Sequence, residues 1–275
     1  MSKINNEDLF KKLEIDLTKC ISDLDIKPGD NIYVTGNIGL LGKVKIKKKS
    51  KLEILFKSFQ NNIGDTGTIF SPAASMNLCN TAIPFDVKNT PSHKMGVFAE
   101  FIRTLPNSIR SFHPFWSIVG VGTEANRLKK VSRHAYGTGS PWSHFLDLDV
   151  TQINIGMNPS NAVTLIHHIE TIVGAPYRYT KEFLHPVVHN GKVNIEPFYQ
   201  SVFYQNSDIR KKVLLNQHYF KKLDSQLLVN KSIHSSGLEF TSFKMKDFYK
   251  VALEYVVDDI YNYLEHVPSI KPYSS

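Results

Sequence analysis

The chain has 275 residues, 41 % hydrophobic and 21 % charged, which is the composition of an ordinary globular protein. It contains no apolar run long enough to span a membrane, and its first residues lack the pattern of a signal peptide. Its two cysteines, Cys20 and Cys79, form neither a disulfide framework nor a zinc pattern. We therefore expect a cytoplasmic protein with no membrane span and no metal.

The net charge of +8 favours anionic partners such as nucleic acid, anionic lipid or phosphorylated small molecules. The densest basic run is KVKIKKKSK, residues 43–51, which we interpret as a solvated loop or, alternatively, as a strand edge protected by charge. No nucleic-acid motif accompanies this run, so nucleic acid is not an expected partner. The sequence leaves a homo-oligomer possible.

Hydrophobic periodicity predicts helices and strands that follow one another along the chain. Helices are expected over residues 6–27, 50–62, 94–105, 124–134, 161–173, 208–230 and 244–265. Strands are expected over residues 32–34, 116–122 and 153–157, and in a segment that ends at Pro72, with a loop over 76–93. Strands that lead into helices indicate an α/β layered fold with a central mixed sheet flanked by helices.

Residues 177–205 differ from the rest because they are rich in Tyr, Phe and Val. Asn190-Gly191 lies in the middle of this segment and suits the type I′ turn of a β-hairpin. No internal repeat or low-complexity linker divides the chain. We therefore expect one domain over residues 1–275, with a β-rich excursion around 177–205.

Polar residues interrupt an apolar run at TLIHHIETIV, residues 164–173. The preceding segment NPSN, residues 158–161, offers a cap and a proline for the start of a helix. On a helix, His167 and Glu170 lie one above the other, whereas His168 flanks the apolar arc and is expected to pack. A histidine beside a carboxylate is typical of a general base, but a solvated surface pair is the favoured alternative from these residues alone.

A zinc site is the alternative interpretation of the same residues. His167 and Glu170 match the first part of the pattern H-x-x-E-H, but Thr171 stands where the last histidine should be. We therefore expect no metal ligand in this segment.

Three segments that occur in order resemble the aminoglycoside 3-N-acetyltransferase family. They are RSFHPFWSIVGVGTEANRL (110–128), HAYGTGSPWSHFLDLD (134–149) and INIGMNPSNAVTLIHHIE (153–170). Upstream, GDNIYVTGNIGLLG resembles the first strand and loop of the family, with Thr35-Gly36-Asn37 where the family has His-Ser-Ser. The resemblance implies transfer of an acyl group from acyl-CoA, as co-substrate, to an amine of an amino sugar.

The resemblance also implies roles for individual residues. His167 is expected to be the catalytic base that activates the acceptor amine, with Glu170 beside it. The loop formed by Thr35, Gly36, Asn37, Ile38 and Gly39 is expected to bind coenzyme A through backbone N–H groups. Arg110, Ser111 and His113 are further candidate coenzyme A contacts, with loop anchoring and a structural histidine as their alternatives.

The chemical class of the acceptor is inferred from the positive charge of the chain. Aminoglycosides are polycations, whereas this chain is basic and carries Tyr177 and Arg178 just after the catalytic helix. Arginine and aromatic side chains suit a phosphate and a stacked base, so these two residues are predicted to bind a nucleotide-linked amino sugar. The first hypothesis is therefore an N-acyltransferase of surface-polysaccharide (O-antigen, lipopolysaccharide) synthesis. The alternatives are an aminoglycoside 3-N-acetyltransferase and a non-catalytic protein that binds coenzyme A or a nucleotide.

Overall fold

The computed structural model describes residues 6–159, 163–204, 217–265 and 267–269. A seven-stranded sheet forms its centre, with the strand order β3-β4-β2-β1-β5-β9-β8. These strands are β1 (Asn31–Gly36), β2 (Thr68–Pro72), β3 (Ile109–Arg110), β4 (Ile118–Gly122), β5 (Thr151–Ile155), β8 (Asn230–Ile233) and β9 (Glu239–Lys244). Strand β1 pairs in parallel with β2 and β5, and the outer pairs are antiparallel. The predicted mixed sheet and α/β fold are confirmed.

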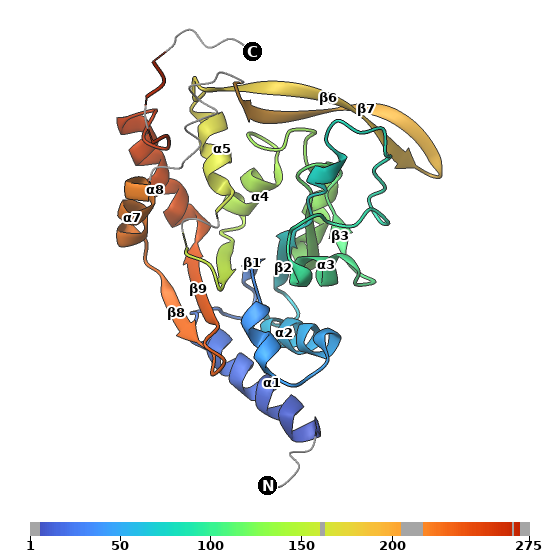
Figure 1. Cartoon of the computed structure of the whole chain (residues 1–275), viewed down its shortest axis with the longest axis vertical. Coiled ribbons are helices and arrows are strands. Elements are labelled where there is room, and N and C mark those ends of the chain that lie inside the picture. The colour runs from blue at the N-terminus through green and yellow to red at the C-terminus, as the bar shows by residue number, and fades with distance from the viewer. Residues whose placement is uncertain (1–5, 160–162, 205–216, 266, 270–275) are drawn as a thin grey trace.

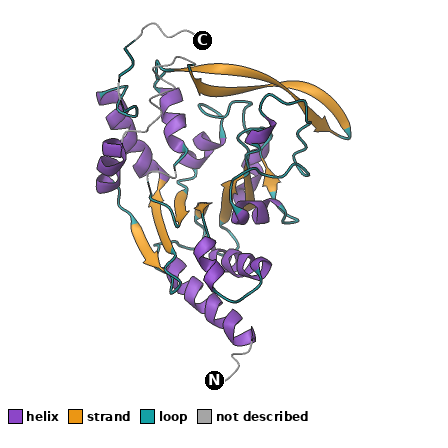
Figure 2. Cartoon of the chain, viewed as in Figure 1, coloured by secondary structure: helices purple, strands orange, loops and turns teal. Residues whose placement is uncertain are grey.

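Helices cover both faces of this sheet, as Figures 1 and 2 show. One face packs against α1 (Asn6–Ser22), α2 (Lys48–Ile63) and α3 (Val97–Arg103). The other face packs against α4 (Pro141–Asp147), α5 (Leu165–Ile172), α7 (Gln217–Gln226) and α8 (Met245–Asp258). The 3₁₀ segments are η1 (Gly39–Lys43), η2 (Met76–Leu78) and η3 (Thr123–Lys130). None of the described helices is long and apolar enough to cross a membrane.

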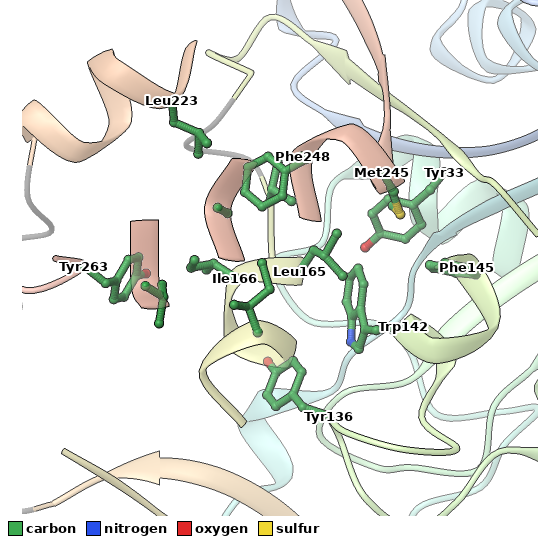
Figure 3. Close-up of a cluster of buried hydrophobic side chains, with 14 of the residues drawn as sticks. Tyr33, Tyr136, Trp142, Phe145, Leu165, Ile166, Leu223, Met245, Phe248 and Tyr263 are labelled. Carbon is green, nitrogen blue, oxygen red and sulfur yellow. The ribbon is translucent and has the colours of Figure 1, made fainter. Parts of the chain in front are cut away.

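The two layers follow from the alternation of side chains along the strands. In β1, Ile32 and Val34 enter the core beneath α1 to α3, whereas Tyr33 enters the core on the opposite side. Figure 3 shows this second core, which contains Tyr33, Trp142 and the α5 residues Leu165 and Ile166. The rings of Tyr33 and Trp142 meet edge to face at 5.6 Å. This aromatic contact joins β1 to α4.

The segment after α5 forms a long two-stranded hairpin of β6 (Arg178–His189) and β7 (Lys192–Phe203). Its turn is at Asn190 and Gly191, whose φ angles are +50° and +77°. Two positive φ angles in succession define a type I′ turn, so the hairpin prediction is confirmed. In Figure 1 the hairpin runs along the top of the molecule, with its root beside α5.

Two glycines bring the loops after β1 and β5 into contact. Gly36 has a φ angle of +140°, and a Cβ there would collide with the backbone of Ile155. Gly156 has a φ angle of +62°, and a Cβ there would lie 2.8 Å from the carbonyl oxygen of Asn37. Because both positions lack a side chain, the Asn37 N–H reaches the carbonyl oxygen of Ile155 at 2.8 Å.

Several element boundaries differ from the prediction. The first helix ends at Ser22 rather than at residue 27, and the predicted helix after β4 is the 3₁₀ segment η3. Helix α5 begins at Leu165 rather than at residue 161. Part of the NPSN cap, residues 160 and 161, and the start of the predicted 208–230 helix lie outside the described residues. Strand β3, helix α4 and the β8–β9 pair were not predicted.

We expect Gly36→Ala to lower the free energy of unfolding by about 2 kcal/mol or more, because the methyl group clashes with backbone rather than with a mobile side chain. Gly42 is a matched control in the same loop, since no heavy atom lies within 4 Å of a Cβ at that position. Urea unfolding of both variants measures the difference. Equal stability of the two variants would contradict this close approach.

Candidate active site

A cavity of about 900 Å³ opens at the carboxyl ends of β1 and β5, where ligands collect in open α/β sheets. Its lining includes the loop Thr35–Gly36–Asn37–Ile38–Gly39 and the side chain of His167. The structure therefore brings together two groups of predicted site residues that are more than 120 positions apart in the sequence. Glu170, Arg110, Ser111, His113, Tyr177 and Arg178 do not line the cavity.

His167 connects this cavity to the protein interior. Its side chain is 24 % exposed, whereas the side chain of Glu170 is fully buried. Nδ1 of His167 lies 2.8 Å from Oε2 of Glu170. The predicted contact between the two residues is present, but the pair is not on a solvated face, because Arg178 of hairpin β6–β7 and Tyr263, after α8, lie against it. Ile172, an apolar residue of the same run, is 47 % exposed.

Arg178, the first residue of β6, completes a buried triangle with these two residues. Its Nε lies 2.9 Å from Oε2 of Glu170, and its Nη2 lies 2.9 Å from Nδ1 of His167. The guanidinium also lies 3.8 Å from the ring centroid of Phe203, on β7. Only 6 % of the Arg178 side chain is exposed, so its charge is balanced by Glu170 rather than by solvent.

The electrostatics of the triangle keep the histidine neutral. Burial lowers the pKa of His167, and the nearby Arg178 charge lowers it further, while Glu170 opposes both. The pKa of Glu170 is also lowered, because the contacts with His167 and Arg178 outweigh the effect of burial. A neutral imidazole beside an ionised carboxylate is the protonation state that a general base requires.

His168 has a different environment, as the helical pattern predicted. Its side chain is buried, and its Nδ1 accepts a hydrogen bond from the backbone N–H of Gly137 at 3.1 Å. Burial lowers the pKa of His168 to about 4. Among the residues that the structure describes, no three His, Cys, Asp or Glu side chains are grouped to hold a metal ion.

The loop after β1 keeps its shape through its own hydrogen bonds. Oδ1 of Asn37 accepts the backbone N–H of Gly39 at 2.8 Å, which is an Asx-turn. Since the Asn37 N–H is bonded to Ile155, two of the N–H groups expected to contact coenzyme A are already used inside the protein. The loop therefore lines the cavity, with part of its donor capacity occupied.

Three lysines line the same cavity, and two of them belong to the basic run that we interpreted as a solvated loop or a strand edge. Lys48 and Lys51 line it from the first turns of α2, and Lys94 lines it from the loop before α3. Lys51 is only 8 % exposed, and no hydrogen bond or ion pair of its ammonium group occurs among the described residues. The basic run directly follows the predicted coenzyme A loop in the sequence, and this position could have identified Lys48 and Lys51.

Arg110, Ser111 and His113 do not line the cavity themselves and are hydrogen-bonded to other protein groups. The Arg110 guanidinium donates to the hydroxyls of Ser117 and Ser75 and to two backbone carbonyls. The hydroxyl of Ser111 accepts the N–H of Ile118 at 2.9 Å. These groups hold the ends of β2 and β4, which agrees with loop anchoring, while direct contact with coenzyme A stays a prediction.

His113 also belongs to the packed interior. Its Nδ1 accepts the backbone N–H of Trp116 at 3.2 Å, and its ring meets Phe198 of β7 edge to face at 5.3 Å. Burial lowers the pKa of His113 to about 4. These contacts join the turn before β4 to the hairpin.

The two residues predicted to bind a phosphorylated acceptor face inward. Tyr177 is fully buried, with its ring stacked on Phe203 at 6.0 Å. Arg178 is committed to Glu170 and His167. Neither side chain is free to meet a nucleotide in the cavity.

Comparison with known proteins identifies the family. Residues 38–256 match the family model described as aminoglycoside 3-N-acetyltransferase. The chain belongs to this family. It is an N-acetyltransferase that uses acetyl-CoA as co-substrate.

The curated relatives carry the same description. Aminoglycoside N(3)-acetyltransferase III from Salmonella sp is 26 % identical over 196 residues, which cover 64 % of this chain and 67 % of the relative. Aminoglycoside N(3)-acetyltransferase VII from Streptomyces paromomycinus is 23 % identical over 201 residues, covering 64 % of this chain and 66 % of the relative. The prediction of a nucleotide-linked amino sugar and a role in polysaccharide synthesis is therefore wrong.

Solved structures share the fold of the acetyltransferase. AAC-VIa bound to sisomicin superposes with a TM-score of 0.74 at 20 % identity, covering 88 % of this chain and 96 % of the other. AAC-IIIb in a binary complex with CoASH superposes with a TM-score of 0.73 at 19 % identity, covering 89 % and 96 %. The mixed sheet with its separate hairpin is thus the architecture of these acetyltransferases.

We expect the folded enzyme to lose stability as the pH falls from about 6.5 towards 5. His113 and His168 keep a pKa of about 4 in the folded protein, whereas in the unfolded chain they take up protons near pH 6.5. Each histidine therefore lowers the free energy of unfolding by about 1–2 kcal/mol at pH 5, where most carboxylates of the unfolded chain are still ionised. Urea unfolding at pH 7.5 and pH 5 measures this loss, and equal or higher stability at pH 5 would refute it.

Proposed function

We propose that the enzyme acetylates the 3-amino group of an aminoglycoside, with His167 as general base. The observation that carries this proposal is the position of the imidazole, which reaches the cavity on one edge and is held by Glu170 on the other. The substrate class comes from the family and from the curated relatives. The proposed step is direct transfer between two bound substrates.

The proposed chemistry follows from the free nitrogen of His167. With Nδ1–H donated to Glu170, Nε2 is the basic atom and takes a proton from the acceptor amine. The amine nitrogen then bonds to the thioester carbonyl carbon, and the carbon–sulfur bond breaks. The imidazolium returns its proton to the departing sulfur, which leaves CoASH and an amide. Holding both substrates in one cavity supplies the rest of the rate enhancement through proximity.

The coenzyme A side of the cavity is assigned by charge. Coenzyme A carries phosphate groups, which favour lysine side chains and the N-terminus of a helix. Lys48 and Lys51 bring both features together at the start of α2, and the first turn of this helix contains no acidic residue. A buried lysine such as Lys51, without an acidic partner among the described residues, gains most from an anionic ligand.

The acceptor side is assigned by aromatic surface. Trp116, Trp142 and Tyr263 line the cavity near His167, and the ring of Tyr263 lies 6.2 Å from the imidazole. Protonated amines bind to the faces of tryptophan and tyrosine rings through cation–π attraction. An aminoglycoside presents several such amines, so these rings suit a polycationic acceptor.

We expect His167→Gln to lower kcat by a factor of about 10²–10⁴, the range for loss of a general base. The assay follows thiol release from acetyl-CoA with gentamicin or sisomicin as acceptor, and mass spectrometry locates the acetyl group. His168→Gln is the matched control. His168 is buried and does not line the cavity, so this variant should keep most of the activity. Turnover of His167→Gln within a few-fold of the parent enzyme would remove the assignment.

Lys51→Met tests the coenzyme A side separately. The substitution keeps the buried stem and removes the charge, so the KM for acetyl-CoA should rise by about 10- to 100-fold. Lys49→Met is the matched control, because Lys49 is exposed and its ammonium group lies 3.8 Å from Glu53. An equal KM for acetyl-CoA in the two variants would contradict the assignment.

A further inference from the structure

Within the buried triangle, Glu170 and Arg178 compete for one atom of His167. The carboxylate can only accept a hydrogen bond, and the guanidinium can only donate one. Nδ1 of His167 lies within hydrogen-bond distance of both, at 2.8 Å from Glu170 and 2.9 Å from Arg178. Since Nδ1 carries either a proton or a lone pair, it can satisfy only one of the two neighbours at a time.

The two neutral tautomers of the imidazole therefore have different partners. With the proton on Nδ1, the ring donates to Glu170 and presents a basic Nε2 to the cavity. With the proton on Nε2, the ring accepts from Arg178 and presents a donor to the cavity. Each neutral tautomer therefore keeps one of its two partners.

The imidazolium is the disfavoured state. In that form Nδ1–H points towards both the carboxylate and the N–H of Arg178, so the contact with the guanidinium becomes repulsive. Arg178 also neutralises Glu170 at 2.9 Å, which reduces the attraction of this carboxylate for a positive ring. Both effects act in the direction of a lower proton affinity, as does burial.

We propose that Arg178 is a positioning residue that disfavours the imidazolium, so that His167 is neutral when the amine binds and readily gives the proton that Nε2 takes from the amine to the departing sulfur. The role in turnover depends on the proposed function. The effect of Arg178 on the histidine does not.

Other groups around the imidazole do not supply this effect. Tyr136, from the loop before α4, and Tyr263, from the segment after α8, meet the ring edge to face at 5.5 and 6.2 Å. Burial raises the pKa of both hydroxyls, and likewise the pKa of Tyr177, so these groups are uncharged at working pH. His168 is neutral because its pKa is low. Glu170 and Arg178 are therefore the charges that face the ring from the described elements packed against it.

The test is a pH titration of His167 by NMR in protein labelled with ¹⁵N-histidine, with its signal assigned by comparison with His167→Gln. In Arg178→Gln the pKa of His167 should rise by about one unit or more, which is tenfold or more in proton affinity. Arg178→Lys retains the charge and should keep most of the original value. The ¹⁵N shifts should also show more of the Nδ1–H tautomer in Arg178→Gln.

Arg133→Gln is the matched control. Arg133 also lies over aromatic rings, those of Phe112 and Phe198, and pairs with Glu196 of β7, but it does not contact the triangle. This variant should leave the His167 titration unchanged. If Arg178→Gln does not fold, Arg178→Lys carries the test, because the loss of the second N–H donor should still enrich the Nδ1–H tautomer.

Kinetics give a second measurement. The acid limb of kcat/KM should move to higher pH in Arg178→Gln, so that activity falls more at pH 6 than at pH 8.5. An unchanged or lowered pKa of His167 in Arg178→Gln would overturn the proposal, whatever happens to activity. If the pKa rises as expected but no acetyl transfer to an aminoglycoside is found in the parent enzyme, the electrostatic role stands and the proposed function fails.

Discussion

A buried ion pair between Glu170 and Arg178 is the interaction on which the site depends. Two opposite charges lie 2.9 Å apart with almost no access to solvent, and removal of either would leave the other unpaired at high cost. The pair joins helix α5 to the root of the hairpin β6–β7. The hairpin is therefore part of the architecture of the site, although none of its residues lines the cavity.

The sheet places the remaining groups around this pair. Parallel pairing of β1 with β5 brings their following loops to one edge, and Gly36 and Gly156 allow these loops to touch. The cavity then has two chemically different sides. Lysines at the start of α2 suit the phosphates of coenzyme A, and aromatic rings near His167 suit the amines of the acceptor. The net charge of the chain is thus accounted for in part by the donor, with no need for an anionic acceptor.

Local patterns in the sequence predicted the local features. The Asn190-Gly191 turn, the β5-to-α5 connection and the contact between His167 and Glu170 depend on residues close together in the chain, so periodicity and turn chemistry were sufficient. The burial of Glu170 was not predictable in this way, because the covering residues come from β6 and from the segment after α8. A helical pattern shows which residues share a face and not what lies against that face.

The wrong assignments of basic residues came from interpreting their charge without knowing their neighbours in space. Arg178 was assigned to a phosphate because an arginine near a catalytic helix suits an anion, and the anion it meets is the buried carboxylate of Glu170. Conversely, Lys51 was assigned to solvent because it belongs to a run of lysines, although the first turns of α2 direct it into the cavity. Each basic residue could be assigned only once its neighbours from distant segments were known.

The most direct test of the account is a crystal structure of the enzyme with CoASH and an aminoglycoside bound together. The account predicts that Nε2 of His167 lies within hydrogen-bond distance of the 3-amino nitrogen, with the sulfur of CoASH in the same cavity. An acceptor amine bound beyond the reach of His167, or beside a different base, would contradict the central claim.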